Sequence, residues 1–244
     1  MGTTTLHGYL NMHSNVKMSS LKEVHYFDNN YKKSLEWYKS YFPIKAKRSS
    51  FISGESTPFY LFHPAVPRRV VSVLPKVKII IVLRNPVERA ISHYKHEFRK
   101  GREVINSIEE AFAQENKRLN AIDKIDRDRY ETFEYSAYSY LSRGKYKDQV
   151  ERWIKEFGAS SILVLNSANL LANPQRELNK VFNFLEIPKM EIIRHLNLNA
   201  STKTENTTNQ RLLNQLTEYF QEDQVLLNSM LKDNNQWINY ELQT

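Results

Sequence analysis

Apolar residues recur along this chain with two periods, one typical of buried strands and one of amphipathic helices. Residues 79–83 and 161–165 are short, almost wholly apolar runs, which predict buried strands. Weaker patterns predict strands at 22–28 and 50–53. Apolar positions three or four residues apart predict helices at 6–10, 35–42, 86–98, 107–119, 146–157, 174–185, 212–220 and 225–231.

The alternation of buried strands and helices determines the predicted fold class. Strands that are apolar on both faces are typical of a parallel sheet with helices on each side, so we predict a three-layer α/β fold. The 244 residues suffice for one such domain, and neither a repeat nor a linker-like stretch interrupts the pattern. We therefore predict a single domain over residues 1–244.

The junction between the strand at 79–83 and the helix after it is the most informative stretch. Arg84 stands where the strand ends, Asn85 suits a helix cap, and Pro86 suits the first helical position. Ser92 lies two turns into that helix. Arg84 and Ser92 are thus expected at the carboxyl end of the strand, where ligands bind in open α/β sheets. A guanidinium and a hydroxyl suit a phosphate group there; the alternative is a junction with a surface arginine.

A second candidate anion site lies at the start of the first helix, formed by Gly2, Thr3, Thr4 and Thr5. Backbone N–H groups at a helix N-terminus, together with small hydroxyl side chains, bind phosphate groups. The P-loop pattern of glycine, lysine and serine or threonine is absent. A threonine-rich helix cap with no ligand is the alternative.

Composition limits the classes of partner that we expect and excludes chemistry that requires cysteine. A net charge of +8 favours an anionic partner. The absence of cysteine excludes disulfides, thiolate catalysis and zinc–thiolate sites, and we expect no metal cofactor. No apolar run reaches the ~18–20 residues of a membrane span, and no signal peptide is evident, so we expect no membrane span and a cytoplasmic location. Nucleic acid is not expected, because no basic cluster with interleaved aromatic residues occurs.

Four motifs, at residues 2–6, 22–27, 54–60 and 83–94, occur in an order that resembles a known family. The family is that of the sulfotransferases that use 3′-phosphoadenosine 5′-phosphosulfate (PAPS). The chain is most similar to the heparan sulfate N- and O-sulfotransferase type and its bacterial relatives. The resemblance covers nearly the whole chain and weakens after about Pro188. It implies a P-loop nucleotide hydrolase-like fold and sulfuryl transfer from PAPS.

The resemblance also implies which residues bind PAPS. It places Gly2, Thr3 and Thr4 on the loop that holds the 5′-phosphosulfate. It places Arg84 and Ser92 at the 3′-phosphate, in agreement with the interpretation of that junction from the residues alone. In the family a basic loop near the C-terminus closes over PAPS, and Lys203 is the only counterpart here.

The catalytic assignment depends on the Lys22-Glu23 pair, which matches the family's motif. The resemblance implies that Glu23 is the general base, taking the proton from the acceptor hydroxyl or amine as it attacks sulfur. Lys22 is expected to stabilise charge nearby. His25, two residues on, would share a strand face with Glu23 and is the alternative base.

Acceptor contacts are expected from Glu55, Ser56 and Tyr60, and from Arg143 at the cleft. The resemblance implies a saccharide or another small acceptor with a hydroxyl or amine group. Ser56 replaces a lysine often found in the family, which weakens the case for a heavily sulfated glycan.

The chain departs from the family at its start. The family's phosphosulfate loop reads Lys-x-Gly-Thr-Thr, and Met1 occupies the x, so the lysine and the first strand of the sheet would precede residue 1. Either the protein begins upstream of Met1, which the intact downstream motifs favour, or it is a relative that has lost these parts. The second alternative is a non-catalytic protein that binds nucleotide or glycan.

Overall fold

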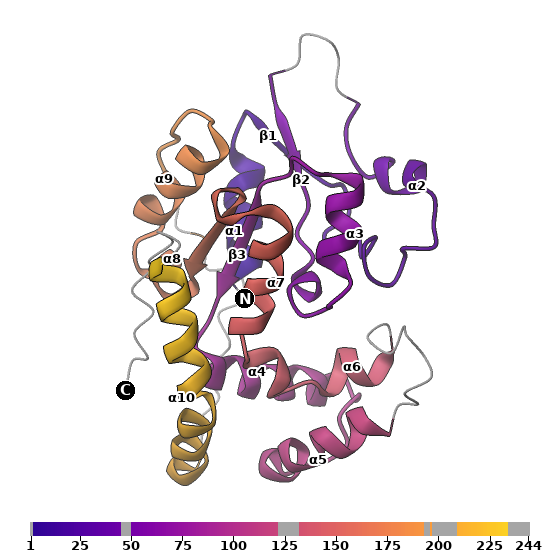
Figure 1. Ribbon diagram of the computed structural model, residues 1–244, viewed down its shortest axis with the longest axis vertical. Helices are drawn as coiled ribbons and strands as arrows, with labels where there is room; N and C mark the ends of the chain where they lie inside the picture. The colour runs from indigo at the N-terminus through magenta and orange to yellow at the C-terminus, as the bar shows by residue number, and fades with distance from the viewer. Residues whose placement is uncertain (1, 45–49, 122–131, 193–195, 197–208, 234–244) are drawn as a thin grey trace. The chain divides into compact units, whose positions relative to one another are not determined.

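The computed structural model of the protein describes residues 2–44, 50–121, 132–192, 196 and 209–233 (Figure 1). Its strands are β1 (Val16–Met18), β2 (Ile52–Gly54), β3 (Ile79–Leu83) and β4 (Ile162–Asn166). Its α-helices are α1 (Gly2–Met12), α2 (Leu35–Lys39), α3 (Val66–Val73), α4 (Pro86–Arg99), α5 (Ile108–Asn120), α6 (Phe133–Tyr138), α7 (Lys147–Phe157), α8 (Ser167–Ala172), α9 (Pro174–Leu185) and α10 (Gln210–Asp233). Short 3-10 turns are η1 (Pro58–Leu61), η3 (Ser142–Gly144) and η4 (Ala159–Ser161).

The chain divides into two compact units, and all four strands belong to the first. Unit 1 comprises Met1–Leu61, Ala65–Leu83 and Trp153–Thr202. Unit 2 comprises Phe62–Pro64, Arg84–Arg152 and Lys203–Thr244. Each unit is described by itself below, and a single domain over the whole chain stays a prediction.

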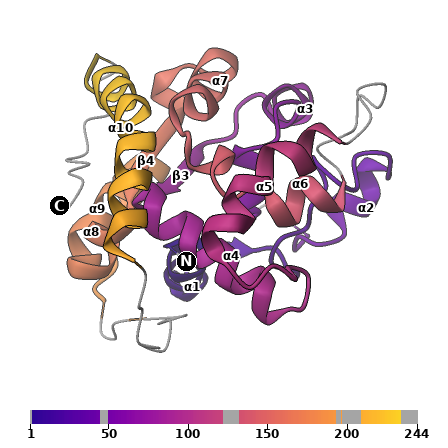
Figure 2. The ribbon, with the colours of Figure 1, turned by 90° about the horizontal axis from the view of Figure 1, so that it is seen from below.

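Two pairs of parallel strands form the sheets of unit 1; Figure 1 labels β1 and β2, and Figure 2 labels β3 and β4. β1 pairs with β2, with Val16 opposite Ile52, and β3 pairs with β4, with Ile79 opposite Ile162. In the part of the chain that the structure describes, no pairing joins β2 to β3. Parallel strands that alternate with helices confirm the predicted α/β class.

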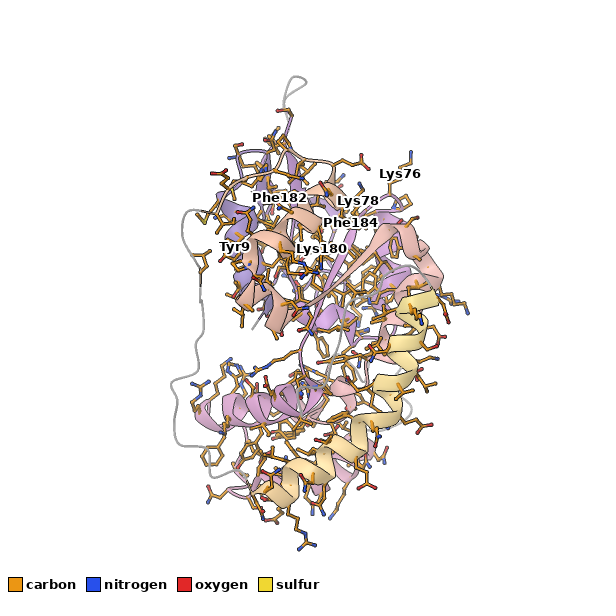
Figure 3. The ribbon with its side chains drawn as sticks, turned by 90° about the vertical axis from the view of Figure 1, so that its left-hand side faces the viewer. Tyr9, Lys76, Lys78, Lys180, Phe182 and Phe184 are labelled. Atoms are coloured by element: carbon orange, nitrogen blue, oxygen red, sulfur yellow. The ribbon has the colours of Figure 1, made fainter. Side chains whose placement is uncertain are left out.

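The main core of unit 1 is built from one side of α1 and the neighbouring elements β1, β4, α8 and α9. Its buried members are Leu6, Tyr9, Leu10, Val16, Leu165, Leu170, Leu178, Val181 and Phe182. Polar contacts of Lys78, which lies near Phe184 in Figure 3, stabilise the edge of this core. The ammonium of Lys78, just before β3, donates to the carbonyl of Phe184 at 2.6 Å and pairs with Glu186 at 2.7 Å. The amino end of β3 is thereby fixed to the end of α9.

Unit 2 packs α4, α5 and α10 around a second core, which contains Val87, Ala90, Tyr94, Ala111, Phe112, Tyr140, Leu212, Leu216 and Phe220. Two buried carboxylates stabilise it. Glu103 binds the guanidinium of Arg118 through both oxygens, at 2.6 and 3.1 Å, and accepts from the Tyr140 hydroxyl at 2.8 Å. Glu115 accepts from the N–H groups of Leu141 and Ser142 at 2.5 and 2.9 Å, so it caps η3.

The predicted helix boundaries are confirmed where the sequence carries a cap. The side chain of Asn85 accepts from the N–H groups of Val87 and Glu88, at 2.9 and 3.2 Å, ahead of α4. The Ser107 hydroxyl accepts from the Glu110 N–H ahead of α5. Gly158 ends α7 with a φ of +74°, a conformation that glycine adopts without strain. The loop predicted at 123–129 lies outside the described residues.

The strand predicted at 22–28 is wrong. The chain forms a strand earlier, at Val16–Met18, and residues 22–28 form turns. Glu23 and His25 have φ values of 63° and 54°, in the left-handed region that a strand excludes. The apolar alternation of this segment therefore reflects buried turn residues, among them Val24 and Phe27, each 1% exposed.

The two helices predicted at 212–220 and 225–231 are one continuous helix, α10. Its buried side chains are Leu212, Leu216, Phe220, Gln224, Leu227 and Leu231, three or four residues apart along the whole element. No glycine or proline falls within it. The polar residues at 221–224 lie within this helix, and its stripe of buried residues continues through Gln224.

We predict that Gly144→Ala destabilises unit 2 by overpacking. A Cβ at Gly144 would lie 2.6 and 2.7 Å from ring atoms of Phe220 and 3.2 Å from Pro86, with no flexible chain end to move aside. The free energy of unfolding should fall by about 1–3 kcal/mol in urea titrations followed by circular dichroism. Gly54→Ala is the control, because its nearest neighbour is the flexible Met18 sulfur at 3.5 Å. Equal stability of the two variants would contradict this packing argument.

Candidate active site

The N-terminus of α1 lies against the carboxyl ends of β3 and β4. A Cβ on Gly2 would lie 2.6 Å from Val82 Cγ1 and 2.9 Å from Ser167 Cβ, so a glycine is required for this approach. The first four N–H groups of an α-helix have no partner within the helix. In α1 they belong to Gly2, Thr3, Thr4 and Thr5, and no acidic side chain stands in this first turn. The predicted anion site therefore has the donors and the helix-dipole field that an anion requires.

The predicted catalytic residues form one chain of charges in unit 1. Lys22 Nζ lies 2.7 Å from Glu23 Oε1, and His25 Nε2 lies 3.7 Å from Glu23 Oε2. On its other side, His25 Nδ1 lies 2.7 Å from Asp28 Oδ2. The Asp28 side chain is completely buried, whereas Glu23 is 38% exposed. Glu23 and His25 were expected to lie together on one face of a strand. They do lie together, but left-handed turns rather than a strand bring them there.

This arrangement sets the protonation states of the two candidate bases. The ion pairs with His25 and Lys22 lower the pKa of Glu23 to about 2, against the opposing effect of burial. Burial lowers the pKa of His25, but the hydrogen bond to Asp28 and the ion pair with Glu23 outweigh it and raise the value to about 9. At neutral pH, Glu23 is a carboxylate and His25 an imidazolium. Only Glu23 is able to accept a proton.

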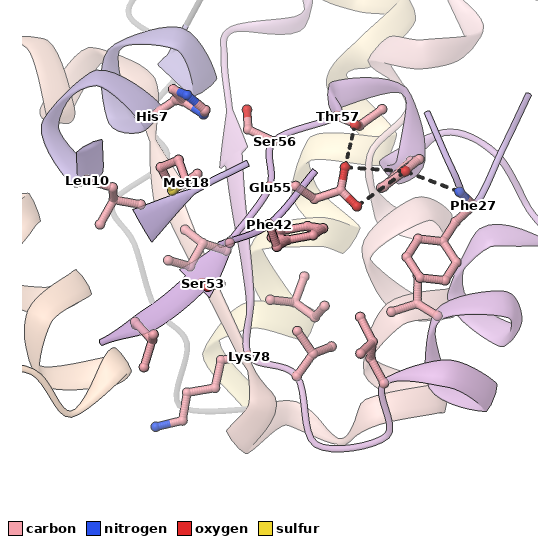
Figure 4. A pocket seen from close by; sticks show the side chains of 18 of the residues that line it. His7, Leu10, Met18, Phe27, Phe42, Ser53, Glu55, Ser56, Thr57 and Lys78 are labelled. Carbon is pink, nitrogen blue, oxygen red and sulfur yellow. Dashed lines mark hydrogen bonds between the residues drawn. The ribbon is translucent and has the colours of Figure 1, made fainter. Parts of the chain in front are cut away.

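Glu55 stands at the centre of a hydrogen-bond network on the wall of a cavity in unit 1 (Figure 4). Its carboxylate accepts from the Tyr38 hydroxyl at 2.8 Å and from Thr57 Oγ1 at 2.9 Å, and the Tyr60 hydroxyl lies 3.4 Å away. The Tyr60 hydroxyl also accepts from the N–H of Phe27, at 3.2 Å. Burial raises the pKa of Glu55. Glu55 and Tyr60 thus connect the turn at Phe27 to η1, and their acceptor roles stay predictions.

Two polar atoms near this network have no hydrogen-bond partner among the described residues. They are Ser56 Oγ and His7 Nδ1, both buried. Figure 4 shows both side chains on the wall of a cavity in unit 1. Burial and the nearby Lys22 ammonium lower the pKa of His7. The charged group around Glu23 and the start of α1 are therefore electrostatically linked within one unit.

The candidate 3′-phosphate residues lie in unit 2. Arg84 directly follows β3, and its Nε donates to Glu88 Oε2 at 2.9 Å, one turn into α4. Ser92 lies further along α4 and is half-buried. Along the chain, Arg84 is two residues from Val82, the residue that Gly2 contacts. The roles of Arg84 and Ser92 at a phosphate stay predictions.

Arg143 also lies in unit 2, where backbone carbonyls hold its guanidinium. Its Nη2 donates to the carbonyls of Tyr135 and Ser136 at 3.2 and 2.9 Å. These bonds give Arg143 a structural role at the end of α6, beside any contact with substrate, which stays a prediction. Lys203 lies outside the described residues.

Asp28 and His7 were not among the predicted site residues. Asp28 orients His25, and the spacing of three residues between them was an available signal once turns replaced the strand. Arg69 supports this turn by donating to the carbonyls of Phe27 and Asp28 at 2.9 and 3.3 Å. His7 carries no signal in the sequence, because its position on the cavity depends on how α1 packs.

Comparison with known proteins identifies the family. The profile of the sulfotransferase domain matches residues 1–240. The chain belongs to the sulfotransferase family. A sulfotransferase structure from Alicyclobacillus acidocaldarius superimposes with a TM-score of 0.73 at 26% identity, covering 95% of this chain and 91% of that one. This confirms both the predicted family and its fold.

Curated relatives of this sulfotransferase are much longer than the matched region. The Xenopus laevis bifunctional heparan sulfate N-deacetylase/N-sulfotransferase 1 is 30% identical over 197 residues, which cover 76% of this chain and 21% of that protein. The human heparan sulfate glucosamine 3-O-sulfotransferase 6 is 29% identical over 200 residues, covering 82% and 53%. The chain thus spans about a fifth to a half of the length of these relatives. Both relatives carry heparan sulfate in their names, and the sequence was found above to resemble that type.

Within the described residues of this sulfotransferase, none of the helices has the length and apolar character needed to cross a bilayer. Nor do three or more histidine or carboxylate side chains gather there in a geometry suited to a metal ion.

We predict that His25 stays protonated at neutral pH and titrates near pH 9. Because its folded-state pKa of about 9 exceeds the ordinary 6.5, its stabilisation is complete below about pH 6.5 and is lost as the pH rises through 9. The wild type should lose about 2 kcal/mol of unfolding free energy over this window. Asp28→Asn, which keeps the side-chain shape, should make this loss of unfolding free energy smaller. Histidine NMR, assigned with His25→Gln, measures the pKa directly, and a His25 value below 7 would refute the assignment.

Proposed function

We propose that this protein transfers a sulfuryl group from PAPS to a hydroxyl or amine of a saccharide. The observation that carries the proposal is the combination found in unit 1. An ionised, partly exposed carboxylate at Glu23 is held by two cations, in the same unit as a helix N-terminus that begins Gly-Thr-Thr-Thr. The names of the heparan sulfate relatives support a saccharide as the acceptor class.

In this proposal the N–H groups at the start of α1 and the hydroxyls of Thr3 and Thr4 bind the 5′-phosphosulfate. Arg84 and Ser92 bind the 3′-phosphate, as the family's motif implies. The acceptor oxygen or nitrogen attacks sulfur in line, the bond from sulfur to the phosphate oxygen breaks, and adenosine 3′,5′-bisphosphate leaves. Positioning and neutralisation of charge supply most of the rate in transfers of this kind.

Glu23 takes the acceptor's proton. A pKa of about 2 keeps its carboxylate ionised but makes it a weak base in the free protein. Lys22 occupies Oε1 at 2.7 Å in that state. We infer that an acceptor hydroxyl displaces Lys22 from this oxygen, which makes Glu23 more basic and frees the ammonium for charge that develops on the transferring group. His25, held as an imidazolium between two carboxylates, orients Glu23 and does not compete for the proton.

We predict that Arg84→Ala weakens binding of adenosine 3′,5′-bisphosphate about 10- to 150-fold in isothermal titration calorimetry, the loss of one charge-assisted contact. Arg99→Ala is the matched control, since it removes an arginine from the far end of α4, the helix that follows Arg84. The affinity of that control should equal the wild type's. A wild-type Kd above about 1 mM, or no difference between the two variants, would count against the nucleotide site.

We predict that Glu23→Gln keeps nucleotide affinity and lowers turnover about 10²- to 10⁴-fold, because the amide cannot accept the proton. The assay is sulfate transfer from PAPS to a panel of saccharide, lipid and phenolic acceptors. His25→Gln should lower turnover less, since it removes only the side chain that orients Glu23. A Glu23→Gln variant with wild-type turnover would move the base assignment to His25. Nucleotide binding without any transfer would instead favour the non-catalytic alternative.

A further inference from the structure

A turn in unit 2 contacts the backbone from which Arg84 projects. This turn, residues 141–146, includes η3 and leads into α7. A Cβ on Gly144 would lie 3.2 Å from Pro86, the first residue of α4, so the turn packs directly on the start of that helix. Two residues on, the hydroxyl of Tyr146 accepts a hydrogen bond from the backbone N–H of Arg84. The 141–146 turn therefore contacts the chain just before and just after the cap of α4.

Side chains from three helices of unit 2 hold the backbone of the 141–146 turn. Glu115 of α5 accepts from the first two N–H groups of the turn, at 2.5 and 2.9 Å. Gln149 of α7 donates to a carbonyl of the turn at 2.5 Å. Asp223 of α10, the helix that Figure 2 shows beside α4, accepts from the N–H of Tyr146 at 2.7 Å. Glu115 and Gln149 are buried, so loss of these bonds would leave unsatisfied polar groups, and the turn is held firmly.

Arg84 is thereby held at two points, its backbone and its side chain. Tyr146, which is 3% exposed, fixes the peptide through the Arg84 N–H. The side chain runs along the first turn of α4, where its Nε donates to Glu88 at 2.9 Å, and 26% of the side chain is exposed. Ordering a long side chain on binding costs free energy, and a group that is already oriented avoids part of that cost. The guanidinium is therefore oriented before a ligand arrives.

We propose that Tyr146 is a positioning residue, whose hydroxyl holds the peptide of Arg84 so that the guanidinium meets the 3′-phosphate of the donor. The inference rests on the proposed function, which assigns Arg84 to that phosphate. Tyr146 acts through Arg84 and does not contact the nucleotide. Asp223 and the other side chains that hold the 141–146 turn keep Tyr146 in place.

The first test compares two nucleotides that differ only in the 3′-phosphate. Tyr146→Phe, which removes one oxygen atom, should weaken binding of adenosine 3′,5′-bisphosphate about 3- to 10-fold in isothermal titration calorimetry. Its affinity for adenosine 5′-monophosphate should equal the wild type's. Tyr94→Phe is the matched control, because it removes a buried hydroxyl of unit 2 that donates to backbone carbonyls at residues 105 and 106. That control should keep both affinities. An unchanged bisphosphate affinity in Tyr146→Phe, or an equal loss for both nucleotides, would overturn the proposal.

The second test asks whether Tyr146 acts through Arg84. In the Arg84→Ala background there is no guanidinium to position, so Tyr146→Phe should weaken bisphosphate binding by less than about twofold further. An equal loss in both backgrounds would mean that Tyr146 acts on the nucleotide independently, contrary to the proposal. A wild type that binds the bisphosphate no more tightly than the monophosphate would instead overturn the 3′-phosphate site of the proposed function, and the positioning role with it.

The third test measures the contact itself, without nucleotide. Amide hydrogen exchange followed by NMR reports how well a single N–H is protected by its hydrogen bond. Tyr146→Phe should accelerate exchange of the Arg84 N–H several-fold, and Tyr94→Phe should leave it unchanged. An Arg84 amide that exchanges at the wild-type rate in Tyr146→Phe would overturn the proposal whether or not the protein binds nucleotide. Failure of this contact is therefore distinguishable from failure of the proposed sulfuryl transfer.

Discussion

The close approach of Gly2 to β3 and β4 is the constraint on which the rest of unit 1 depends. No other residue type fits, since a Cβ would lie 2.6 Å from Val82. This contact fixes the first turn of α1 at the carboxyl ends of two parallel strands, and the free N–H groups of that turn lie there as a consequence. The same placement directs α1 so that Leu6 and Tyr9 reach the main core. One glycine thus positions both an anion site and a helix face.

The charged group around Glu23 illustrates how local strain serves a site. Two non-glycine residues, Glu23 and His25, adopt left-handed conformations, which cost free energy and persist only where the surroundings enforce them. The buried Asp28 and the hydrogen bonds from Arg69 to the neighbouring carbonyls supply that enforcement. The Glu23 carboxylate is therefore kept ionised by a cation on either side, while part of it is exposed to solvent. A regular strand would have separated His25 from Asp28, which are three residues apart and would lie on opposite faces.

The sequence predicted those parts of the structure that depend on local chemistry. β3, β4 and the start of α4 follow from apolar runs and from the cap at Asn85, and the structure confirms them. The prediction of a strand at 22–28 was wrong because buried turns and buried strands give the same pattern of apolar residues in a sequence. The length of α10 was missed because a polar Gln224 interrupts an apolar stripe that tertiary packing sustains. Thr57 and Tyr60 lie within five residues of Glu55, but its third partner, Tyr38, comes from a separate segment and depends on packing that no local pattern encodes.

The cavity beside α1 connects the packing of unit 1 to the predicted anion site, because Thr3, Leu6 and Leu10 of that helix all line it. The position of α1 depends on what lies beneath Leu6 and Leu10, and the N–H groups of Gly2 and Thr3 move with the helix. Ser56 Oγ and His7 Nδ1, which lack partners among the described residues, lie on the same wall. The Glu23 group is held separately, because its contacts come from the turn at 22–28 and from Arg69. Donor binding and proton transfer are in this sense supported by different parts of one unit.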